Sequence, residues 1–592
     1  MKTLQTDIVV IGGGGAGLRA AIAVAEADPK ARVALVSKVV PMRSHTVAAE
    51  GGSAGVIRPD DSLQNHFDDT VHGGDWLCEQ DVVDYFVAHC TEEMIQLEQW
   101  GCPWSRHPDG QINVRFFGGM KVQRTWFAAD KSGFHILHTL FQTSLKFPSI
   151  QRFDEYFCCE LLVDNGAVRG VLAIEIATGD LLLIECKAVV MATGGAGRVY
   201  RQNTNAGIVT GDGMGMAFAQ GVPLRDMEFV QYHPTCLPGT GILMTEACRG
   251  EGGILTNKDG HRYLMDYGLG PLDPWPRPKA MELGPRDRLS QAFWHELQKG
   301  NTYDTPHGPA VNLDLRHLGE QKIMERLPLI TEAARTFAGV DPVKSPIPVC
   351  PAVHYTMGGI TCDVNCATPL PGLFAAGECA SVGIHGANRL GSNSLAELLV
   401  FGKVAGESAL RHARESAASG STVAAGVQRL GDAAAQRVLG LLNQDSGDRV
   451  ATLRDGMRNT METNVGIYRD GKAMQEACNT LADLRDRYRR GVKLDDRSRA
   501  FNTEWLSAIE LGFTLQVAQT MAHSAVLREE SRGAHQRLDQ FNTRDDEKFL
   551  CHSLATAQGD DAPSISHGPV KITRSQPMAR VYGGAGTKAV MT

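Results

Sequence analysis

Histidines and arginines suited to binding an anion recur in five short stretches of the middle of the chain. Arginine keeps its charge and binds carboxylate oxygens in pairs, so a converging set of such residues suits a small anion with two carboxylates. Surface ion pairing is the alternative for each residue taken singly. The stretches are QYHPT with His233, LMTEACRGEGG with Arg249, ELGPRDRLSQAFW with Arg286 and Arg288, HYTMGG with His354, and HGANRLGSNSLAEL with Arg389.

A glycine-rich turn near the N-terminus indicates a second kind of site. The segment TDIVVIGGGGAGLRAAIAVAEA predicts a buried strand over residues 8–11 and a helix over residues 18–27. ARVALVSK predicts a second parallel strand over residues 31–38. Gly12, Gly14 and Gly17 have the G-x-G-x-x-G spacing, which lets the backbone approach a pyrophosphate at the helix N-terminus. The unit therefore predicts a dinucleotide-binding fold.

The residues after the second strand discriminate between dinucleotides. An NAD site usually carries an acidic residue there to hold a ribose, whereas this chain has Ser37 and Lys38. That difference favours a flavin dinucleotide. Two later buried runs, AVVMATGGAG (residues 188–197) and GLFAAGECAS (residues 372–381), predict further strands of the same sheet. Glu378, after the last of them, is placed to accept hydrogen bonds from cofactor hydroxyls.

Composition restricts the class of protein. The 592 residues are 43% hydrophobic and 21% charged, as in a soluble globular protein, and the net charge of -8 disfavours nucleic acid as a partner. The 14 cysteines show no CxxC…CxxC spacing, so we expect reduced thiols and no metal site. We recognise neither a signal peptide nor an apolar run of membrane-spanning length, so we expect membrane contact only through a partner.

These patterns predict an α/β architecture in several parts. We expect a Rossmann-like FAD-binding domain interrupted by an inserted α+β capping domain, then a helical domain and an irregular C-terminal region. In the helical domain, Leu506, Ile509, Phe513 and Val517 recur at helical spacing and predict an amphipathic stripe. The expected boundaries are 1–227 and 352–415 for the FAD-binding domain, 228–351 for the capping domain, 416–535 for the helical domain and 536–592 for the C-terminal region.

Eight motifs occur in the order typical of one known family. They are GGGGAGLRAA, PMRSHTVAAEGGSAGV, GGDWLCEQDVVDYF, QYHPT, TEACRGEGG, HYTMGG, ANRLGSNSLAEL and SRGAHQRLD. With them the sequence resembles, over essentially its whole length, the flavoprotein subunits of the fumarate reductase/succinate dehydrogenase family. The resemblance is greatest to the membrane-associated bacterial quinol:fumarate reductases.

The resemblance implies roles for individual residues. The histidine of RSHT, His45, is implied to be bonded through its ring to the 8α-methyl of FAD. Substrate binding is implied for His233, Thr245, His354 and Arg389. Catalysis is implied for Arg286 as the proton-transfer residue, for Glu246 and Arg249 as its relay, and for His233. Cofactor binding is implied for Gly12, Gly13, Gly14, Gly15, Ala16, Gly17, Ser37, Lys38, Ser44, His45, Thr46, Glu50, Gly51, Gly52, Asp212, Glu378, Arg389, Ser394 and Leu395.

The implied reaction interconverts fumarate and succinate, with hydride exchanged at N5 of FAD and a proton at Arg286. Glu50, in AAEGG, matches the fumarate reductases, whereas succinate dehydrogenases more often have glutamine there. An iron–sulfur subunit, membrane anchor subunits and a quinone are the implied partners. The implied location is the cytoplasmic face of the cell membrane.

Other functions remain open from the residues. A succinate dehydrogenase subunit working in the oxidative direction is one, and L-aspartate oxidase, which normally lacks the flavin-linking histidine, is another. A non-catalytic FAD-binding scaffold would tolerate loss of the cationic residues, and an NAD-dependent dehydrogenase is disfavoured by Ser37 and Lys38. We further expect Cys248, beside Arg249, to react readily with thiol reagents, because a guanidinium favours the thiolate.

Overall fold

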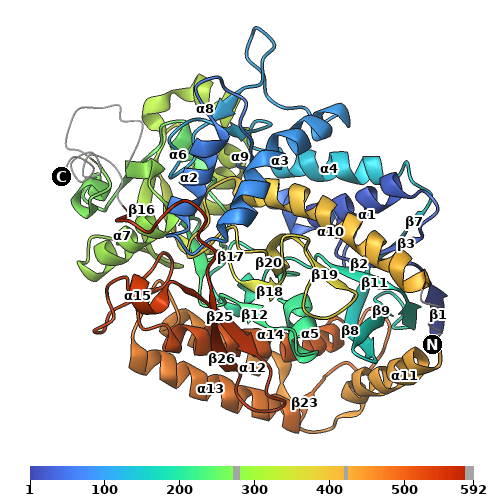
Figure 1. Cartoon of the computed structure of the whole chain (residues 1–592). Helices are drawn as coiled ribbons and strands as arrows, with labels where there is room; N and C mark the ends of the chain where they lie inside the picture. Colours follow the sequence, from blue (N-terminus) through green and yellow to red (C-terminus); the bar gives the residue numbers. More distant parts are fainter. Residues whose placement is uncertain (271–280, 419–423, 581–592) are drawn as a thin grey trace.

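A five-stranded parallel sheet organises the largest part of the computed structural model, which describes residues 1–270, 281–418 and 424–580 (Figure 1). The strand order is β19-β11-β2-β3-β7, and Ile8 pairs with Val33 on one side and Ala188 on the other. The strands are β2 (Ile8–Ile11), β3 (Val33–Ser37), β7 (Ile150–Asp154), β11 (Ala188–Met191) and β19 (Leu373–Ala375). The prediction for residues 8–11 is confirmed, and the second strand is shorter than predicted.

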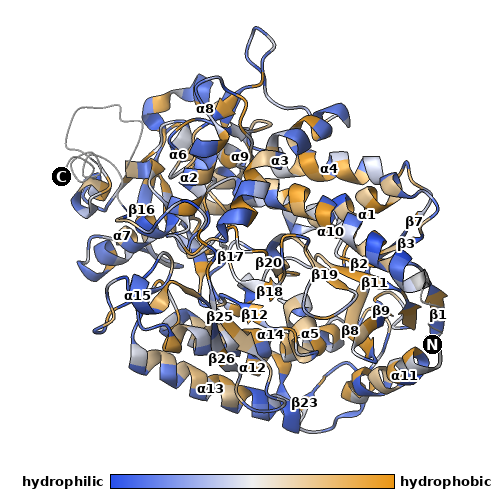
Figure 2. Cartoon of the chain, viewed as in Figure 1, coloured by the Kyte–Doolittle hydropathy of each residue, from blue (hydrophilic) through white to orange (hydrophobic). Residues whose placement is uncertain are grey.

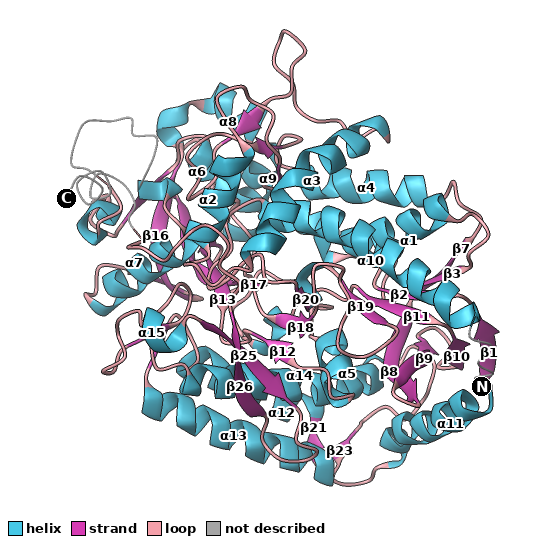
Figure 3. Cartoon of the chain, viewed as in Figure 1, coloured by secondary structure: helices cyan, strands magenta, loops and turns pink. Residues whose placement is uncertain are grey.

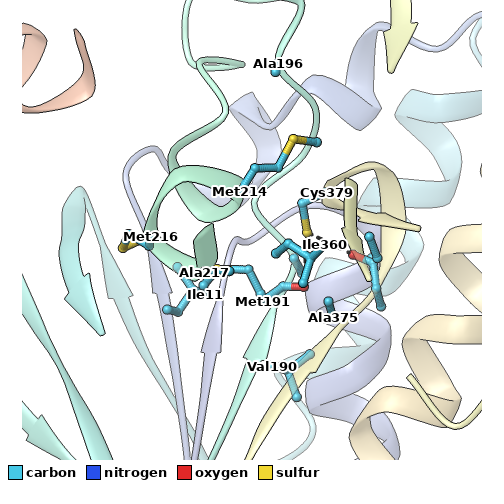
Figure 4. Packing of buried hydrophobic residues seen from close by; sticks show 14 of the residues in the cluster. Ile11, Val190, Met191, Ala196, Met214, Met216, Ala217, Ile360, Ala375 and Cys379 are labelled. Atoms are coloured by element: carbon cyan, nitrogen blue, oxygen red, sulfur yellow. Dashed lines mark hydrogen bonds between the residues drawn. The ribbon is translucent and has the colours of Figure 1, made fainter. Parts of the chain in front are cut away.

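Helices α1 (Gly15–Ala27) and α10 (Asn393–Ala418) run beside one another along this sheet (Figure 3). Helix α1 begins at Gly15 and not at residue 18, because the Gly15 amide donates a hydrogen bond to Thr46 Oγ1 at 3.1 Å and so extends the helix toward the glycine turn. On the sheet itself, Ile11 and Met191 pack with Met214 and Met216 of α5 (Asp212–Ala219) (Figure 4). The glycine turn is therefore held by a continuous apolar core.

A second sheet flanks the first. Its order is β1-β10-β9-β8, and helix α11 (Ala424–Gly440) lies against it. The strands are β1 (Lys2–Gln5), β8 (Tyr156–Asp164), β9 (Ala167–Glu175) and β10 (Leu181–Glu185).

The segment between β13 and β17 has a hydrophobic core of its own, which includes Leu255, Leu289, Leu313 and Ile330. Its antiparallel sheet has the order β13-β17-β16-β14, with β15 paired to β16. The strands are β13 (Val230–Cys236), β14 (Ile254–Thr256), β15 (Tyr303–Thr305), β16 (Gly308–Asp314) and β17 (Ile347–Thr356). The helices are α6 (Glu246–Gly250), α7 (Arg286–Gln298), α8 (Glu320–Arg326) and α9 (Pro328–Ala338). We call this segment the capping part; β17 continues past the boundary expected at residue 351.

Three long helices follow α11: α12 (Val450–Asn464), α13 (Gly471–Arg490) and α14 (Thr503–Leu527) (Figure 1). The amphipathic prediction for α14 was wrong. Trp505, Leu511 and Leu515 are buried as well as Ile509 and Val517, because α5, α12 and α13 all pack against the helix. Figure 2 shows the contrast with α13, whose polar residues are grouped along one side.

The prediction of an irregular C-terminal region was also wrong for residues 551–569. Strands β25 (Cys551–Thr556) and β26 (Ser564–Pro569) form a hairpin that extends a sheet of order β20-β18-β12-β25-β26. The other strands are β12 (Leu224–Arg225), β18 (Gly359–Thr361) and β20 (Ala380–Ser381). β26 is largely exposed, so its sequence carries no continuous apolar run.

The remaining α-helices and β-strands of the described chain are as follows. The helices are α2 (Leu63–Gly73), α3 (Gln80–Gln99), α4 (Ser132–Ser144) and α15 (Asp546–Phe549). The strands are β4 (Ser53–Ala54), β5 (Val114–Arg115), β6 (Thr125–Trp126), β21 (Asp448–Arg449), β22 (Tyr468–Arg469), β23 (Val492–Lys493) and β24 (Gln536–Arg537). Within the described ranges no helix is long and apolar enough to cross a membrane.

Candidate active site

A cavity lies at the carboxyl ends of β2, β3, β11 and β19. In sheets of this kind ligands bind at that edge. Most of the residues expected to bind the cofactor line it: Gly12, Gly13, Gly14, Gly15, Ala16, Ser37, Lys38, Ser44, His45, Thr46, Glu50, Asp212, Glu378, Ser394 and Leu395. Gly17, Gly51, Gly52 and Arg389 do not line it.

Two positions of the glycine turn require glycine, because a side chain there would collide with the backbone. Gly12 has φ +114°, and a Cβ there would lie 2.1 Å from the Ala192 carbonyl oxygen. A Cβ on Gly17 would lie 1.8 Å from the Gly12 carbonyl oxygen. Gly17 therefore supports the turn from behind, while the N-terminus of α1 faces the cavity and favours an anionic group such as a phosphate.

Gly51 and Gly52 do not line the cavity but pack behind the loop that does. A Cβ on Gly51 would meet the Phe117 ring at 2.4 Å, and Gly52 (φ +130°) lies against the Trp126 carbonyl. The Gly51 carbonyl accepts a hydrogen bond from Arg115 Nε at 3.2 Å. The two glycines hold the loop that carries Glu50.

His45 begins a 3₁₀ turn (His45–Ala48) beside the cavity. Its Nε2 lies 3.3 Å from Asn205 Nδ2, and its Nδ1 accepts a hydrogen bond from the Ala206 amide at 3.4 Å. Burial, and secondly the charge of Arg198, lower the pKa of His45 to about 4. The imidazole is therefore neutral at pH 7.

Lys38 is held by two carboxylates at the cavity wall. Its Nζ lies 2.5 Å from Asp212 Oδ2 and 2.8 Å from Glu510 Oε1 of α14, and it donates to Thr210 Oγ1 at 3.0 Å. Burial opposes the ammonium form, but the two carboxylates outweigh it and raise the pKa of Lys38. The predicted cofactor residues Lys38 and Asp212 thus neutralise each other.

Two other cavity carboxyls, Glu378 and Glu50, are held differently. Glu378 Oε1 accepts a hydrogen bond from the Thr356 amide at 3.0 Å, and burial raises its pKa to about 7. Burial, and secondly the nearby Asp130 carboxylate, raise the pKa of Glu50 well above its usual value. The protonated form of either group can donate a hydrogen bond to a ligand oxygen or nitrogen.

The histidines and arginines predicted to bind an anion lie together at one end of this cavity. We call them the cation cluster: His233, Arg249, Arg286, His354 and Arg389. The rings of His233 and His354 have centroids 5.1 Å apart, and His354 also lines the cavity. Burial lowers the pKa of both histidines well below its usual value, and the charge of Arg286 lowers both further. Arg389 has a pKa lowered to about 10 for the same two reasons. Arg288 is exposed, so it stays outside this cluster.

Glu246 joins two of the arginines. Its Oε2 accepts from Arg286 Nη2 at 2.7 Å and lies 3.8 Å from Arg249 Nη2, while Oε1 accepts from the Gly118 amide at 2.5 Å. All three side chains are almost fully buried. Burial raises the pKa of Glu246, but the two guanidinium groups outweigh it and hold the pKa below its usual value. The carboxylate is therefore ionised between two fixed positive charges.

Arg389 is fixed by neighbours on the sheet and on α10. Its Nη1 donates to Ser394 Oγ at 3.0 Å, and its guanidinium carbon lies 4.4 Å from the centroid of the Tyr355 ring. The Tyr355 hydroxyl donates to Glu397 at 2.7 Å. This arrangement orients the guanidinium at the boundary between the cavity and the cation cluster.

Several buried donors in the cluster have no hydrogen-bond acceptor in the described part of the chain. His233 Nε2, Arg249 Nε and Nη2, and Arg389 Nε are buried and make no hydrogen bond within the described residues. The Thr245 hydroxyl caps α6 by accepting from the Ala247 amide at 3.4 Å, and it keeps its own proton free to donate. A dianion bound among these groups would satisfy them.

Sequence reasoning missed the residues that position this cluster. Gln231 accepts from Arg286 Nη1 at 3.2 Å and donates to the Arg389 carbonyl at 2.8 Å. Thr204 lies 2.8 Å from His354 Nδ1, and Asn205 contacts His45. Gln231 stands in the same QYHPT motif as His233, so its spacing was a usable signal, whereas Thr204 and Asn205 lie in no motif.

The expectation of a reactive Cys248 was wrong in its physical basis. Cys248 is fully buried in the capping part. Burial raises the pKa of its thiol, the Glu50 carboxylate raises it further, and the Arg249 charge does not compensate. The thiol is therefore protonated at neutral pH.

Comparison with known proteins gives the family. The FAD binding domain model matches residues 7–395, and the fumarate reductase flavoprotein C-terminal model matches residues 454–582. The chain belongs to the fumarate reductase/succinate dehydrogenase flavoprotein family.

Individual members of this family are similar over almost the whole chain. The Escherichia coli (strain K12) fumarate reductase flavoprotein subunit is 63% identical over 99% of this chain and 97% of its own length. The succinate dehydrogenase flavoprotein subunit of Rickettsia bellii is 39% identical over 96% of this chain and 95% of its own length. A solved quinol-fumarate reductase with menaquinol molecules matches with a TM-score of 0.95 and 62% identity, covering 98% of this chain and all of that one.

Proposed function

We propose that this chain is the catalytic flavoprotein subunit of a membrane-associated quinol:fumarate reductase that interconverts fumarate and succinate. One observation carries the proposal: His354 belongs both to the wall of the cavity beside the glycine turn and to the cation cluster. A cofactor in the cavity and a dianion in the cluster would therefore meet at this residue. The 63% identity to a fumarate reductase flavoprotein subunit supports the same activity.

FAD fits the cavity through its glycine turn, the N-terminus of α1 and the Glu378 carboxyl. When bound, FAD supplies the hydride chemistry that no amino-acid side chain provides. We further propose a covalent attachment through the His45 ring. The neutral imidazole beside the cavity supports this, because its ring nitrogen could act as the nucleophile toward the 8α-methyl carbon. One methyl C–H bond would be broken with loss of a proton, and the electron pair of that bond would be left on the flavin.

The dicarboxylate is proposed to lie among His233, Thr245, His354 and Arg389. Their buried donors suit two carboxylates. Holding both carboxylates fixes the alkene and stabilises the charge that develops during reduction, since the donors are oriented in advance and shielded from water.

Arg286 is proposed to exchange the proton at the substrate carbon, with Glu246 and Arg249 as its relay. The N-terminus of α7 fixes Arg286, and Glu246 lies within hydrogen-bond reach of its guanidinium. An arginine gives up a proton reluctantly. A proton taken up by Glu246 and passed directly to Arg286 would restore the charged form without involving bulk water.

Reduction of fumarate is the proposed main direction. Glu50 at the cavity wall, and identity that is higher to the fumarate reductase relative than to the succinate dehydrogenase relative, support it. The reverse oxidation of succinate uses the same groups, and L-aspartate oxidase is the remaining alternative.

Electrons are proposed to reach the flavin from a quinol through membrane anchor subunits and an iron–sulfur subunit, with this chain peripheral on the cytoplasmic face. The fold match to a quinol-fumarate reductase with menaquinol supports this.

The test is purification of the complex from membranes, followed by assay with fumarate and a menaquinol analogue, with succinate and quinone, and with L-aspartate and oxygen. Faster fumarate reduction with co-purifying iron and subunits is expected. Faster succinate oxidation would reverse the direction. Oxidation of L-aspartate by a chain that purifies without other subunits would refute the proposal.

A further inference from the structure

The last described segment of the chain is tied to the FAD-binding part. We call residues 571–580 the strap. The fully buried Gln80, at the start of α3, holds it: Gln80 Nε2 donates to the Ser575 carbonyl at 2.7 Å, and Gln80 Oε1 accepts from the amides of Thr573, Arg574 and Ser575 at 3.0–3.1 Å. Trp76 Nε1 donates to Ser575 Oγ at 3.0 Å. The beginning of the strap is therefore well anchored.

At its end the strap reaches across to the capping part. Arg580 Nη1 lies 2.5 Å from Asp287 Oδ2, and Arg580 Nη2 lies 3.1 Å from Asp287 Oδ1, so the carboxylate is held by both arms of the fork. The same Nη2 donates to the Gly73 carbonyl, at the end of α2, at 3.1 Å. One guanidinium thus joins α2, which packs in the main core, to α7, which packs in the capping core.

The position of Asp287 makes this contact relevant to catalysis. Asp287 directly follows Arg286 in the first turn of α7, and its side chain is only 1% exposed. A buried carboxylate that loses its partner is strongly destabilised, and it relieves this by becoming protonated or by moving toward water. Movement of Asp287 would shift the turn that carries it and Arg286. A misplacement of about 1 Å of a reacting group can reduce turnover about a hundredfold.

We propose that Arg580 is a positioning residue for the reaction. Through Asp287 it fixes the first turn of α7 relative to the FAD-binding part, and so sets where the Arg286 guanidinium lies against the dicarboxylate and the flavin. This inference rests on the proposed role of Arg286 in proton transfer.

The experiment uses the assembled, full-length complex with four variants: Arg580→Gln, Arg580→Lys, Asp287→Asn and the double variant Arg580→Gln/Asp287→Asn. Arg574→Gln is the matched control. It makes the same charge change on the same strap, but Arg574 bonds to Asp84 and Gln64 on α3 and α2, and not to α7. The measured quantities are kcat and KM for fumarate, the solvent isotope effect on kcat, and the flavin content.

Arg580→Gln is expected to lower kcat at least tenfold with KM changed less than threefold, and to raise the solvent isotope effect because proton transfer becomes slower. Arg580→Lys keeps the charge without the fork and should recover part of the loss. The double variant should be no slower than the slower single variant. Arg574→Gln should stay within twofold of the native enzyme.

The inference is overturned if kcat of Arg580→Gln stays within twofold of that of Arg574→Gln. It is also overturned if the fold-loss of kcat in the double variant equals the product of the fold-losses in Arg580→Gln and Asp287→Asn. If Arg580→Gln does not assemble, Arg580→Lys decides in the same way: lower kcat at constant KM supports the inference, and native kcat overturns it. Arg286→Gln is measured in parallel. Turnover retained in that variant would refute the role of Arg286 itself, whereas turnover lost there but native in Arg580→Gln refutes only the positioning role.

Discussion

Arg286 contacts one oxygen of Glu246 through two nitrogens, with Nε at 2.8 Å and Nη2 at 2.7 Å from Oε2. Only Nη1 points elsewhere within this group, toward Gln231 Oε1 at 3.2 Å. A carboxylate on one side and an amide on the other therefore fix the orientation of the guanidinium plane.

This relationship predicts a loss of turnover when Arg286 is replaced by Gln. A group used only in the transition state lowers kcat and leaves ground-state binding in place. We expect kcat for fumarate to fall by several orders of magnitude, while dicarboxylate binding, followed by flavin absorbance, remains measurable. A variant that keeps more than about a tenth of native turnover, which is a barrier change below about 1.4 kcal/mol, would transfer the proton-donor role to Arg249.

His354→Ala and His233→Ala should instead weaken substrate binding first. Both rings lie in the cation cluster and offer donors to a dianion, so their loss removes binding that ground and transition states share. KM for fumarate should rise at least tenfold with a smaller change in kcat. Arg288→Gln, an exposed position on α7, is the control and should leave KM within twofold. A fall in kcat alone for the histidine variants would assign them to proton transfer.

His45→Ser should leave FAD bound without a covalent link. After acid denaturation, the native protein is expected to keep its yellow colour and to show flavin mass on the peptide that contains His45, whereas the variant releases free FAD. Succinate oxidation should fall more than fumarate reduction, because loss of the link lowers the flavin potential. Free FAD released from the native protein would show that the cofactor is held only by noncovalent contacts.

Cys248 should resist thiol reagents in the native protein. Its thiol is buried and protonated at neutral pH, whereas Cys551 is the one cysteine among the described residues that is partly exposed. Brief labelling at pH 7 followed by peptide mapping should modify Cys551 first and Cys248 only as the chain unfolds. Rapid inactivation that a dicarboxylate prevents, with label on Cys248, would restore the opposite expectation.

Acid should destabilise the protein through its buried histidines. Burial, and secondly Arg124, lower the pKa of His66 from 6.5 to about 3. The unfolded chain then binds a proton below pH 6.5 that the folded chain does not bind until near pH 3. Stability is therefore lost as the pH falls through this window, by up to about 1.4 kcal/mol per pH unit for this residue.

His66→Gln keeps a donor for Asn393 Oδ1, which lies 3.0 Å from His66 Nε2, and should flatten the decline of the thermal midpoint between pH 6 and pH 4. His107→Gln, at an exposed position, is the control. An unchanged slope in the His66 variant would mean that the folded state admits the proton.

The parts of the fold that depend only on residues adjacent in sequence were predictable. The strand at residues 8–11, the glycine turn and the following helix are specified locally, and His45, Glu378 and Ser394 line the predicted cavity. The helix start at Gly15 was not predictable, since it depends on the Thr46 hydroxyl of a later loop.

Other features depend on tertiary approach. Glu510 of α14 brings a second carboxylate to Lys38 from a distant part of the chain, and no spacing in the sequence predicts that contact. The thiol of Cys248 shows the same effect with opposite sign: its neighbour in sequence favours the thiolate, but its surroundings in space prevent it. Local charge patterns therefore predict the members of a site better than their protonation states.

The hairpin of β25 and β26 has a consequence for biosynthesis. Strand β12 pairs with β18 and β25, and Gln80 bonds to residues 571–575. During synthesis, the glycine turn, the capping part and all the predicted catalytic residues are made before the strands and the strap that complete these contacts. An open strand edge of this kind invites pairing with other chains. A stop codon just before residue 551 would thus release a polypeptide that contains every predicted catalytic residue but lacks the strand that pairs with β12, and such a polypeptide is expected to aggregate.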